Sequence, residues 1–252
     1  MDILDITPEN IDREHICCAL SDKKGENCVS SKKNWMKAAF RDGLVFKRMD
    51  ARGKAFIEYI PAEKAWCPID AKNCLHIDCF WVSGSLKGKG YSTRLLDACV
   101  ADAVAAGKNG LTIVSSDRKM PFLSDPDHLR NRGFRAVDSA PPHFQLFYLP
   151  VKAKAPPPKF RDAVKAGDSG KGGFALYYSN QCPFTDKYAP IFRTLAKERG
   201  APVKLIRLES AAQAQRAPTP FTAYSLFHDG RFVTNEILSE KKIDKLLAEK
   251  GF

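Results

Sequence analysis

Long hydrophobic runs are missing from this 252-residue sequence. No stretch approaches the roughly 18 to 20 uncharged apolar residues that a membrane-spanning helix requires. The N-terminal segment Met1–Asp5 is acidic, and it lacks the basic start and apolar core of a secretion signal. These absences argue against a membrane protein and against export, so we expect a cytoplasmic protein.

Paired cysteine motifs are missing as well. The sequence contains eight cysteines, but no two have the CxxC spacing of a structural zinc site. They are Cys17, Cys18, Cys28, Cys67, Cys74, Cys79, Cys99 and Cys182. Several lie inside apolar runs, where a reduced cysteine acts as a small hydrophobic residue. We therefore expect no metal site and, Cys182 apart, mainly buried free thiols.

The formal net charge is +11, but the basic residues do not form a continuous stripe along the sequence. Lys and Arg residues are scattered, and no run interleaves them with aromatic residues as a groove for single-stranded nucleic acid would. We therefore expect no nucleic-acid partner. A basic protein of this kind also suits a small anionic ligand.

The composition changes near the middle of the chain. Lys152–Pro158 has the character of a stiff polyproline spacer, Gly167–Gly173 has loop composition, and Lys159–Ala166 between them is predicted as a short helix. The resulting division is a first domain at 1–151, a Pro/Gly-rich linker at 152–171 and a second domain at 172–252.

Apolar periodicity predicts α/β structure in both domains. In the first we expect strands at Gly43–Met49, Ala55–Ile60, Leu75–Val82, Leu111–Ser115 and Phe144–Leu149, and helices at Ser92–Ala106 and Asp125–Arg132. In the second we expect strands at Phe174–Tyr178, Val203–Leu208, Phe221–Phe227 and Arg231–Val233, and helices at Pro183–Arg199 and Ser239–Glu249. The second domain therefore has the order β-α-β, a crossing segment, and β-β-α.

A glycine-rich turn, Ser83–Tyr91, joins the strand Leu75–Val82 to the following helix. Such a turn directs backbone N–H groups toward one point at the positive end of a helix dipole, which suits a pyrophosphate. Lys87 and Lys89 add positive charge. The spacing matches neither GxGxxG nor GxxxxGK[ST], so dinucleotide and nucleoside-triphosphate motifs are excluded.

The turn resembles motif A of the GNAT superfamily, [QR]-x-x-G-x-[GA], which here falls on Lys87, Gly90 and Ser92 after Val82. Gly133-Phe134 stands where the family ends motif B. The resemblance implies a mixed β-sheet with flanking helices that binds acetyl-CoA as co-substrate. The residues that it implies for acetyl-CoA are Phe80, Val82, Lys87, Gly88, Lys89, Gly90, Tyr91 and Ser92.

The resemblance also implies a catalytic strand, Leu75–Val82, whose backbone near Phe80 to Val82 holds the acetyl carbonyl. His76 and Asp78 share one face of this strand. Members of the superfamily often carry a base at such positions, so either residue is a candidate base, and Asp78 is also a candidate orienter of His76 or partner of the substrate ammonium. A neighbouring carboxylate is expected to raise the pKa of His76.

The chain departs from the family at the residue that protonates the CoA thiolate. Many members carry a Tyr four residues before the Gly-Phe of motif B, and here that position is Leu129. Either the thiolate leaves without that acid, or another residue such as His128 supplies the proton.

Phe56–Pro61, Asp78–Gly84, Pro121–Asp125 and the C-terminal half resemble YoaP-type N-acetyltransferases, in which a small domain follows the GNAT domain. That domain resembles a thioredoxin-like fold, with Cys182–Thr185 in place of CxxC and a candidate cis proline at Pro218 or Pro220. A cysteine at a helix N-terminus favours a reactive thiolate. Because Thr185 replaces the resolving cysteine, we expect a recognition domain rather than a dithiol oxidoreductase.

Three functions remain open at this point. The first is acetyl transfer from acetyl-CoA to an amine that the sequence does not identify. The second is a thiol-redox or thiol-binding protein that uses Cys182, with the GNAT domain as a CoA sensor. The third is a non-catalytic acyl-CoA-binding protein. The oligomeric state is left open as well.

Overall fold

The computed structural model describes residues 1–16 and 18–252; Cys17, one of the cysteines expected to be reduced, lies outside the described residues. The strands are β1 Ile3–Ile6, β2 Val45–Met49, β3 Ala55–Pro61, β4 Ile69–Asp70, β5 Leu75–Val82, β6 Gly110–Ser116, β7 Arg135–Ala140, β8 Phe144–Pro150, β9 Lys159–Phe160, β10 Phe174–Tyr178, β11 Val203–Arg207, β12 Tyr224–His228 and β13 Arg231–Thr234. The α-helices are α1 Cys28–Ala39, α2 Tyr91–Ala105, α3 Pro126–Asn131, α4 Phe184–Glu198, α5 Ala211–Ala214 and α6 Glu240–Glu249.

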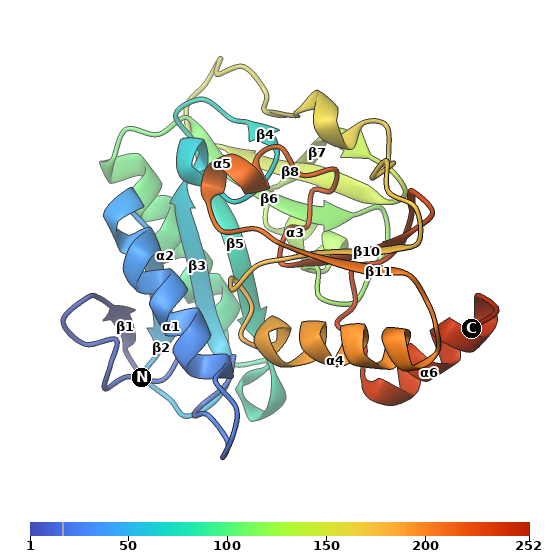
Figure 1. The fold of residues 1–252 in the computed structure, drawn as a ribbon. Coiled ribbons are helices and arrows are strands. Elements are labelled where there is room, and N and C mark those ends of the chain that lie inside the picture. The colour runs from blue at the N-terminus through green and yellow to red at the C-terminus, as the bar shows by residue number, and fades with distance from the viewer. Residues whose placement is uncertain (17) are drawn as a thin grey trace.

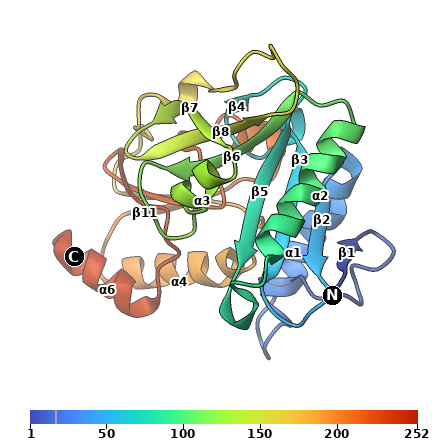
Figure 2. The ribbon, with the colours of Figure 1, turned by 180° about the vertical axis from the view of Figure 1, so that it is seen from behind.

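Seven strands form a mixed sheet, the large sheet, in the order β1-β2-β3-β5-β6-β8-β7. Helices cover both of its faces, with α1 in front in Figure 1 and α2 in front in the reverse view of Figure 2. Trp35 and Met36 of α1 pack with Phe56, whereas Leu95 of α2 packs with Ile57 on the opposite face. This alternation along β3 explains why a continuous apolar run forms a strand here. The mixed sheet with flanking helices confirms the predicted fold class.

The large sheet opens at its centre. Strands β5 and β6 run parallel and pair from Leu75 to Ile77, opposite Leu111 to Ile113, and then separate. On its other side β5 pairs with β3, and the register shifts so that Cys79 faces Glu58 while Ile77 faces Tyr59. Asp78 is therefore the extra residue of a β-bulge, a feature that bends a strand and re-aims its side chains. The second half of β5 leaves its parallel neighbour at this bulge.

The C-terminal part forms a second sheet, the small sheet, in the order β11-β10-β12-β13. Strand β10 is parallel to β11 and antiparallel to β12, and β13 closes the hairpin through Asp229 and Gly230, both with positive φ. Helices α4 and α6 share one apolar cluster against this sheet, and α5 lies over its other face. The element order matches the predicted one and is compatible with the expected thioredoxin-like unit.

Residues 159–166 do not form the predicted helix. Instead β9 pairs with β4, Ile69 facing Phe160, and a short 3₁₀ turn follows at Asp162–Val164. Phe160 and Val164 are buried in the cluster that includes α1 and β8. Burial of these two apolar residues against β4 explains why the segment forms a strand and a 3₁₀ turn although its local pattern favours a helix.

Neither Pro218 nor Pro220 follows a cis bond. Among the described residues, the one cis peptide joins Pro141 and Pro142. The expectation of a cis proline at Pro218 or Pro220 was therefore wrong. The cis and trans isomers of an X–Pro bond differ so little in energy that the sequence alone does not determine which one forms.

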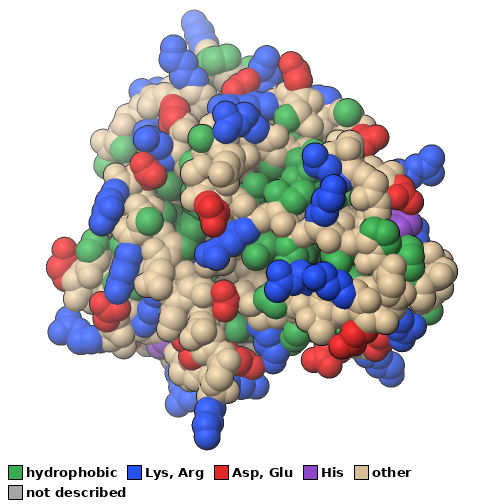
Figure 3. All heavy atoms as spheres, in the orientation of Figure 1, with side chains coloured by type: hydrophobic (Ala, Val, Ile, Leu, Met, Phe, Trp, Pro, Cys, Tyr) green, Lys and Arg blue, Asp and Glu red, His purple; other side chains and the backbone are tan. Residues whose placement is uncertain are grey.

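Surface charge is mixed on the face shown in Figure 3, where Lys and Arg side chains are scattered among Asp and Glu and surround central hollows with hydrophobic walls. Within the described part of the chain, no helix is both long and apolar enough to cross a lipid bilayer.

Candidate functional site

A cavity of about 590 Å³, the large cavity, lies at the end of β5. One wall comes from Phe80–Val82 and the turn that follows, through Lys87, Gly88 and Ser92. The opposite wall comes from the segment between β6 and α3 and from His128. The structure thus gathers most of the residues expected to hold acetyl-CoA, while Lys89, Gly90 and Tyr91 lie outside this lining.

The turn between β5 and α2 has the shape that the glycine spacing predicts. Gly88 and Gly90 have φ of +73° and +74°, a conformation that favours glycine, and a Cβ at either position would meet open space. The first turn of α2 consists of Tyr91, Ser92, Thr93 and Arg94 and contains no acidic side chain. Its free N–H groups and the lysines of the turn favour an anion at this end of the cavity.

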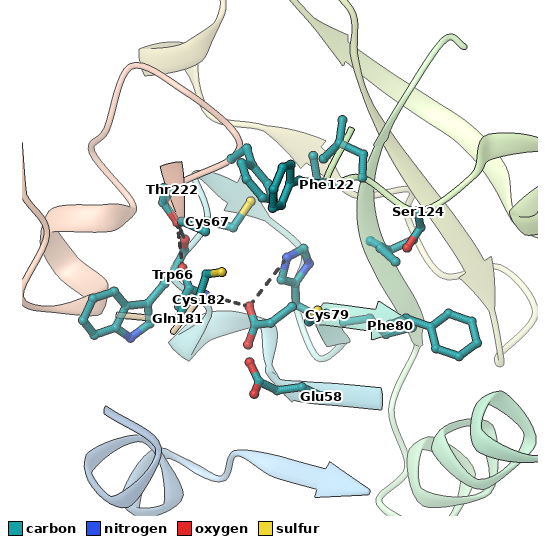
Figure 4. A pocket seen from close by; sticks show the side chains of 18 of the residues that line it. Glu58, Trp66, Cys67, Cys79, Phe80, Phe122, Ser124, Gln181, Cys182 and Thr222 are labelled. Atoms are coloured by element: carbon teal, nitrogen blue, oxygen red, sulfur yellow. Dashed lines mark hydrogen bonds and ion pairs between the residues drawn. The ribbon is translucent and has the colours of Figure 1, made fainter. Parts of the chain in front are cut away.

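A second, smaller hollow of about 110 Å³, the inner pocket, lies where β5 and β6 separate. It shares Phe80, Trp81 and the residues of Phe122–Ser124 with the large cavity, so the two hollows adjoin. Its far side comes from the C-terminal part of the chain, through Gln181, Cys182 and the loop before β12 (Figure 4). Cys182 and Pro220 both line this pocket.

His76 lies within the inner pocket, with its side chain 4% exposed. Its Nδ1 is 2.9 Å from the Thr112 hydroxyl, which in turn donates to the Leu75 carbonyl at 3.3 Å. Nδ1 therefore carries the proton, and Nε2 faces Asp78 with its lone pair. Burial lowers the pKa of His76 to about 3. The expectation that Asp78 raises this pKa was wrong, because burial outweighs a carboxyl group that is itself held uncharged.

Asp78 shares the pocket face with His76, as predicted, and its Oδ1 is 4.0 Å from His76 Nε2. Its side chain is 3% exposed. Burial raises its pKa well above the usual range, and the nearby Glu58 carboxylate raises it further. Oδ1 accepts a hydrogen bond from Gln181 Nε2 at 3.2 Å, whereas Oδ2 has no hydrogen-bond partner among the described residues. The protonated acid is favoured here.

A buried ion pair lies below Asp78. Lys32 of α1 donates to both carboxylate oxygens of Glu58 on β3, at 2.8 and 2.6 Å, and each side chain is 1% exposed. Burial opposes the charge on Lys32, but the Glu58 carboxylate keeps the lysine's pKa above its usual value. Burial also raises the pKa of Glu58 and thus disfavours its charge. The contact with Lys32 opposes this effect and keeps the carboxylate charged. One buried cation thus stands beside two acidic groups.

Gln181 connects the small sheet to β5. Its Oε1 accepts from Ser179 Oγ at 3.1 Å and lies 3.0 Å from Thr222 Oγ1, while its Nε2 bonds Asp78. Thr222 also donates to the Trp66 carbonyl of the N-terminal part. These contacts fix the amide and leave its NH₂ group directed at Asp78 (Figure 4).

Cys182 is not the activated thiol that its position at a helix N-terminus suggests. It precedes α4, and the Phe184 N–H acts to lower its pKa, but burial prevails and raises the pKa of the thiol to about 12. Burial similarly raises the pKa of Cys67, and a hydrogen bond with Cys18 together with burial raises that of Cys79. The thiols of the pocket are therefore neutral, weakly polar wall atoms.

His128 and Leu129 differ in what they can reach. Leu129 is fully buried in the cluster beneath α2, so the position of the family tyrosine belongs to the core. His128 lines the large cavity, with its ring 6.0 Å from that of Phe80. Partial burial and the charge of Arg132 lower its pKa. His128 is thus a neutral imidazole whose N–H can donate.

Sequence reasoning missed Glu58, Lys32, Gln181 and Thr222. Glu58 had a usable signal, because a carboxylate inside the apolar run Ala55–Ile60 is costly unless paired, as is also true of Asp78 inside Leu75–Val82. Gln181 and Thr222 carry no such signal, because their role depends on how the two sheets meet. No group of three His, Cys, Asp or Glu residues suited to a metal occurs among the residues that the structure describes.

Two family models match the chain: the acetyltransferase (GNAT) family over residues 17–121 and the YoaP-like family over residues 202–245. The uncharacterized N-acetyltransferase YoaP of Bacillus subtilis (strain 168) is 44% identical over 244 residues, which cover 97% of each protein.

Similar solved structures include the aminoglycoside 6'-N-acetyltransferase of Enterococcus faecium, at 11% identity and a TM-score of 0.44, covering 62% of this chain and 100% of that one. Ard1 of Thermoplasma volcanium is 11% identical with a TM-score of 0.41, over 60% of this chain and 98% of its own. On its identity to the Bacillus relative over nearly the full length, the chain belongs to the YoaP-type GNAT N-acetyltransferases.

Proposed function

We propose that this enzyme transfers the acetyl group of acetyl-CoA to an amine, with the co-substrate in the large cavity and the amine in the inner pocket. The observation that carries the proposal is the separation of β5 from β6 after Ile77, at the place where the two hollows adjoin. The backbone beyond this point can offer an N–H to the acetyl carbonyl, which stabilises charge as it develops on that oxygen. Membership of the GNAT family supports the same assignment.

Basic side chains on both walls of the large cavity support acetyl-CoA as co-substrate. Lys87 and Lys119 both line the cavity, and Gly88 lets the backbone approach a ligand closely. A pyrophosphate would lie at the N-terminus of α2, where aligned peptide dipoles favour an anion. Lys89, Gly90 and Tyr91 shape this turn in our proposal rather than line the cavity.

The amine must lose two protons during the reaction, and two buried groups can take them. Asp78 is a neutral acid in the resting site, and it releases its proton to solvent when an ammonium enters beside it. The ammonium can then pass its first proton to Oδ2 of this carboxylate, giving an acid and a free amine, an uncharged pair that a dry pocket favours. The amine nitrogen then attacks the thioester carbon, and His76 Nε2 takes the second proton. When the C–S bond breaks, its electron pair goes to sulfur and the CoA thiolate leaves. His76 returns its proton to solvent, and solvent supplies the proton that the sulfur takes up.

His128 is the group that we assign to the leaving thiolate. It lines the same cavity as Lys87, on the wall opposite β5, and its neutral ring can donate a hydrogen bond to the sulfur. A solvent water can then deliver the proton, so His128 need not be charged in the resting enzyme.

Release of free CoA thiol from acetyl-CoA in the presence of a panel of amines tests this proposal. We expect thiol release that depends on both substrates, and mass spectrometry should find one added acetyl group per amine. His76→Gln should lower kcat on the order of 10²–10⁴-fold if His76 is a general base, with little change in acetyl-CoA affinity. Absence of turnover with every amine, despite acetyl-CoA binding, would favour a non-catalytic protein.

The rival functions receive no support from the comparisons. A thiol-redox protein would also need an accessible, low-pKa thiol, and the pKa of Cys182 is raised. We retain in this proposal the division into 1–151, a linker at 152–171 and 172–252, and a cytoplasmic location.

A further inference from the structure

The inner pocket is built by both parts of the chain. The large sheet supplies His76, Asp78 and the residues around them, and the small-sheet part supplies Gln181, Cys182 and Pro220–Ala223. Gln181, Cys182 and Thr222 lie on the side of the pocket away from Phe80, so the small-sheet part closes that side (Figure 4). An acceptor must therefore fit a space of about 110 Å³ rather than lie across an open groove.

The charges around the pocket balance only while Asp78 holds its proton. Glu58 and Asp78 are both almost fully buried, and Lys32, held at 2.6 Å by Glu58, is the cation beside them. Within the described residues, Asp78 Oδ2 is a buried oxygen without a hydrogen-bond partner. Orphaned buried polar atoms are rare, and Asp78 lines the inner pocket, so we take this oxygen as the contact for a ligand group. A cationic ligand placed against Oδ2 would satisfy this oxygen and would balance the charge that Asp78 acquires when it releases its proton.

In the part of the chain that the structure describes, the rest of the lining offers no cationic side chain that could pair with an anion. Among the described residues that line the inner pocket there is no Lys or Arg. The walls are aromatic and aliphatic, as at Trp66, Ile113 and Phe221, together with neutral thiols. A carboxylate placed here would be desolvated without a partner, which costs several kcal/mol in general. Amino acids, which carry one, are therefore poor candidates.

The volume limits the size of the acceptor. Cavities of roughly 150 Å³ hold a molecule of the size of benzene. The inner pocket is somewhat smaller, so it accommodates a short apolar body of a few carbon atoms next to the nitrogen.

We propose that the two sheets together form an acceptor site for a small primary amine that has a short apolar body and no carboxylate, with its ammonium against Asp78 Oδ2. This inference rests on the proposed function, since it names the amine class of the same site. It assigns the C-terminal part a direct role in substrate selection.

Gln181 is the positioning residue of this site. Its amide holds Asp78 Oδ1 at 3.2 Å, which leaves Oδ2 for the ligand. Ser179 and Thr222 fix the amide in turn, so the small sheet sets the direction of the carboxyl group on β5. Loss of this bond should weaken amine binding without changing the acetyl-CoA cavity, which Gln181 does not line.

Calorimetry of the full-length protein without acetyl-CoA tests the proposal separately from catalysis. The probes are n-butylamine, 4-aminobutyrate and butyrate. We expect n-butylamine to bind, 4-aminobutyrate to bind at least about tenfold more weakly, and butyrate not to bind. Asp78→Asn should weaken n-butylamine binding by about tenfold or more, as for loss of a charged hydrogen-bond partner. Asp162→Asn, at an exposed carboxylate, is the matched control and should bind as the wild type does.

Gln181→Met keeps the size of the side chain and tests the site in case Asp78→Asn does not fold. It should raise KM for n-butylamine several-fold and leave KM for acetyl-CoA unchanged. Equal or tighter binding of 4-aminobutyrate, or unchanged amine binding in both variants, would overturn the proposal. Amine binding with the expected preference but without CoA release would support this site and refute acetyl transfer, so the two failures can be told apart.

Discussion

At the scale of single residues, burial decides the charge state of the site. His76, Asp78 and Cys182 all lie where water is scarce, and each pKa moves in the direction that favours the neutral form. In the resting site, Lys32 and Glu58 keep their charges because they contact each other. The pocket is thus dry and nearly neutral before substrate enters. In such surroundings the electrostatic interactions of any charge that the substrate brings are stronger than in water.

His76 should make the protein sensitive to acid. Its pKa is about 3 in the folded protein and about 6.5 in the unfolded chain, so between these values the unfolded chain binds a proton that the folded protein does not. Stability contributed by the neutral histidine is therefore complete above about pH 6.5 and is lost as pH falls toward 3. The loss is about 1.4 kcal/mol per pH unit in this window.

Urea unfolding at pH 7.5 and at pH 5.0 measures this effect. The wild type should lose about 2 kcal/mol more than His76→Gln between the two pH values. His128→Gln is a control for the loss of a more exposed histidine, on α3 rather than on β5. If wild type and His76→Gln lose equal stability, His76 is not held neutral by burial.

Cys182 should label slowly with iodoacetamide. With a pKa of about 12, its thiolate fraction at pH 7 is on the order of 10⁻⁵, whereas a free cysteine with a pKa near 8.5 is a few per cent ionised. We expect labelling on the order of 10³-fold slower than that of free cysteine, measured by mass spectrometry of the peptide that contains Cys182. Labelling at the rate of free cysteine would restore the reactive-thiol hypothesis.

At the scale of elements, the turn between β5 and α2 should determine acetyl-CoA binding. Gly88→Asp places a negative charge where the cavity receives phosphate, and its φ of +73° adds strain. A ligand at one hundred times its Kd stabilises the native state by about 2.7 kcal/mol, and this variant should lose most of that stabilisation. Thermal unfolding with and without acetyl-CoA measures it.

Gly200→Asp is the matched control, because Gly200 has a φ of +71° and equally open surroundings after α4. It should show the same intrinsic strain while keeping the full acetyl-CoA shift. A full shift in Gly88→Asp would remove the turn from the binding site.

The elements that sequence predicted well are those whose own residues are apolar. Strand β5 has the predicted bounds, and β10 does too, because each is a short, mainly apolar run that begins in buried residues. Helix α1 was missed. Its inward face includes Lys32, a charge in the middle of the hydrophobic stripe that is buried only because Glu58 from another element neutralises it. Such a tertiary pairing leaves no local pattern.

One side of the site could be predicted from the sequence, and the other side could not. The strand with His76 and Asp78 and the glycine turn could be found from spacing, because their chemistry requires those residue types next to one another. The opposite wall, with Gln181 and Thr222, comes from segments far away in the sequence. Its placement depends on the packing of two sheets, which no local signal in the chain encodes.

At the scale of the whole molecule, the two sheets are joined by contacts well beyond the inner pocket. Gln215 donates to the carbonyls of Glu63 and Ala65 at 3.0 Å, and Asn235 donates to that of Pro121 at 2.8 Å. Phe232 of β13 packs edge-on against Phe144 of β8, with ring centroids 5.4 Å apart. These contacts set the position of the small sheet and therefore that of Gln181.

Loosening this interface away from the pocket should impair the use of the amine selectively. Phe232→Ala removes the ring that contacts both His143 and Phe144, so the small sheet loses its anchor on β8. Misplacement by about 1 Å can cost on the order of 10²-fold in rate when geometry matters. We expect kcat/KM for the amine to fall at least tenfold, while the Kd of acetyl-CoA stays within about twofold, because the large cavity belongs to the N-terminal part.

Phe252→Ala supplies the comparison that separates position from stability. Phe252 packs on Phe174 and His228 inside the small-sheet part, so its loss removes an aromatic contact of the same kind without touching β8. Both variants should lower the melting temperature, but in Phe252→Ala the kinetics with the amine should be unchanged at temperatures where the protein is folded. Equal kinetic losses in the two variants would mean that the small sheet acts through overall stability. A loss confined to Phe232→Ala would mean that catalysis depends on how the second sheet is held against the first, because the ring contact that is removed lies outside both hollows.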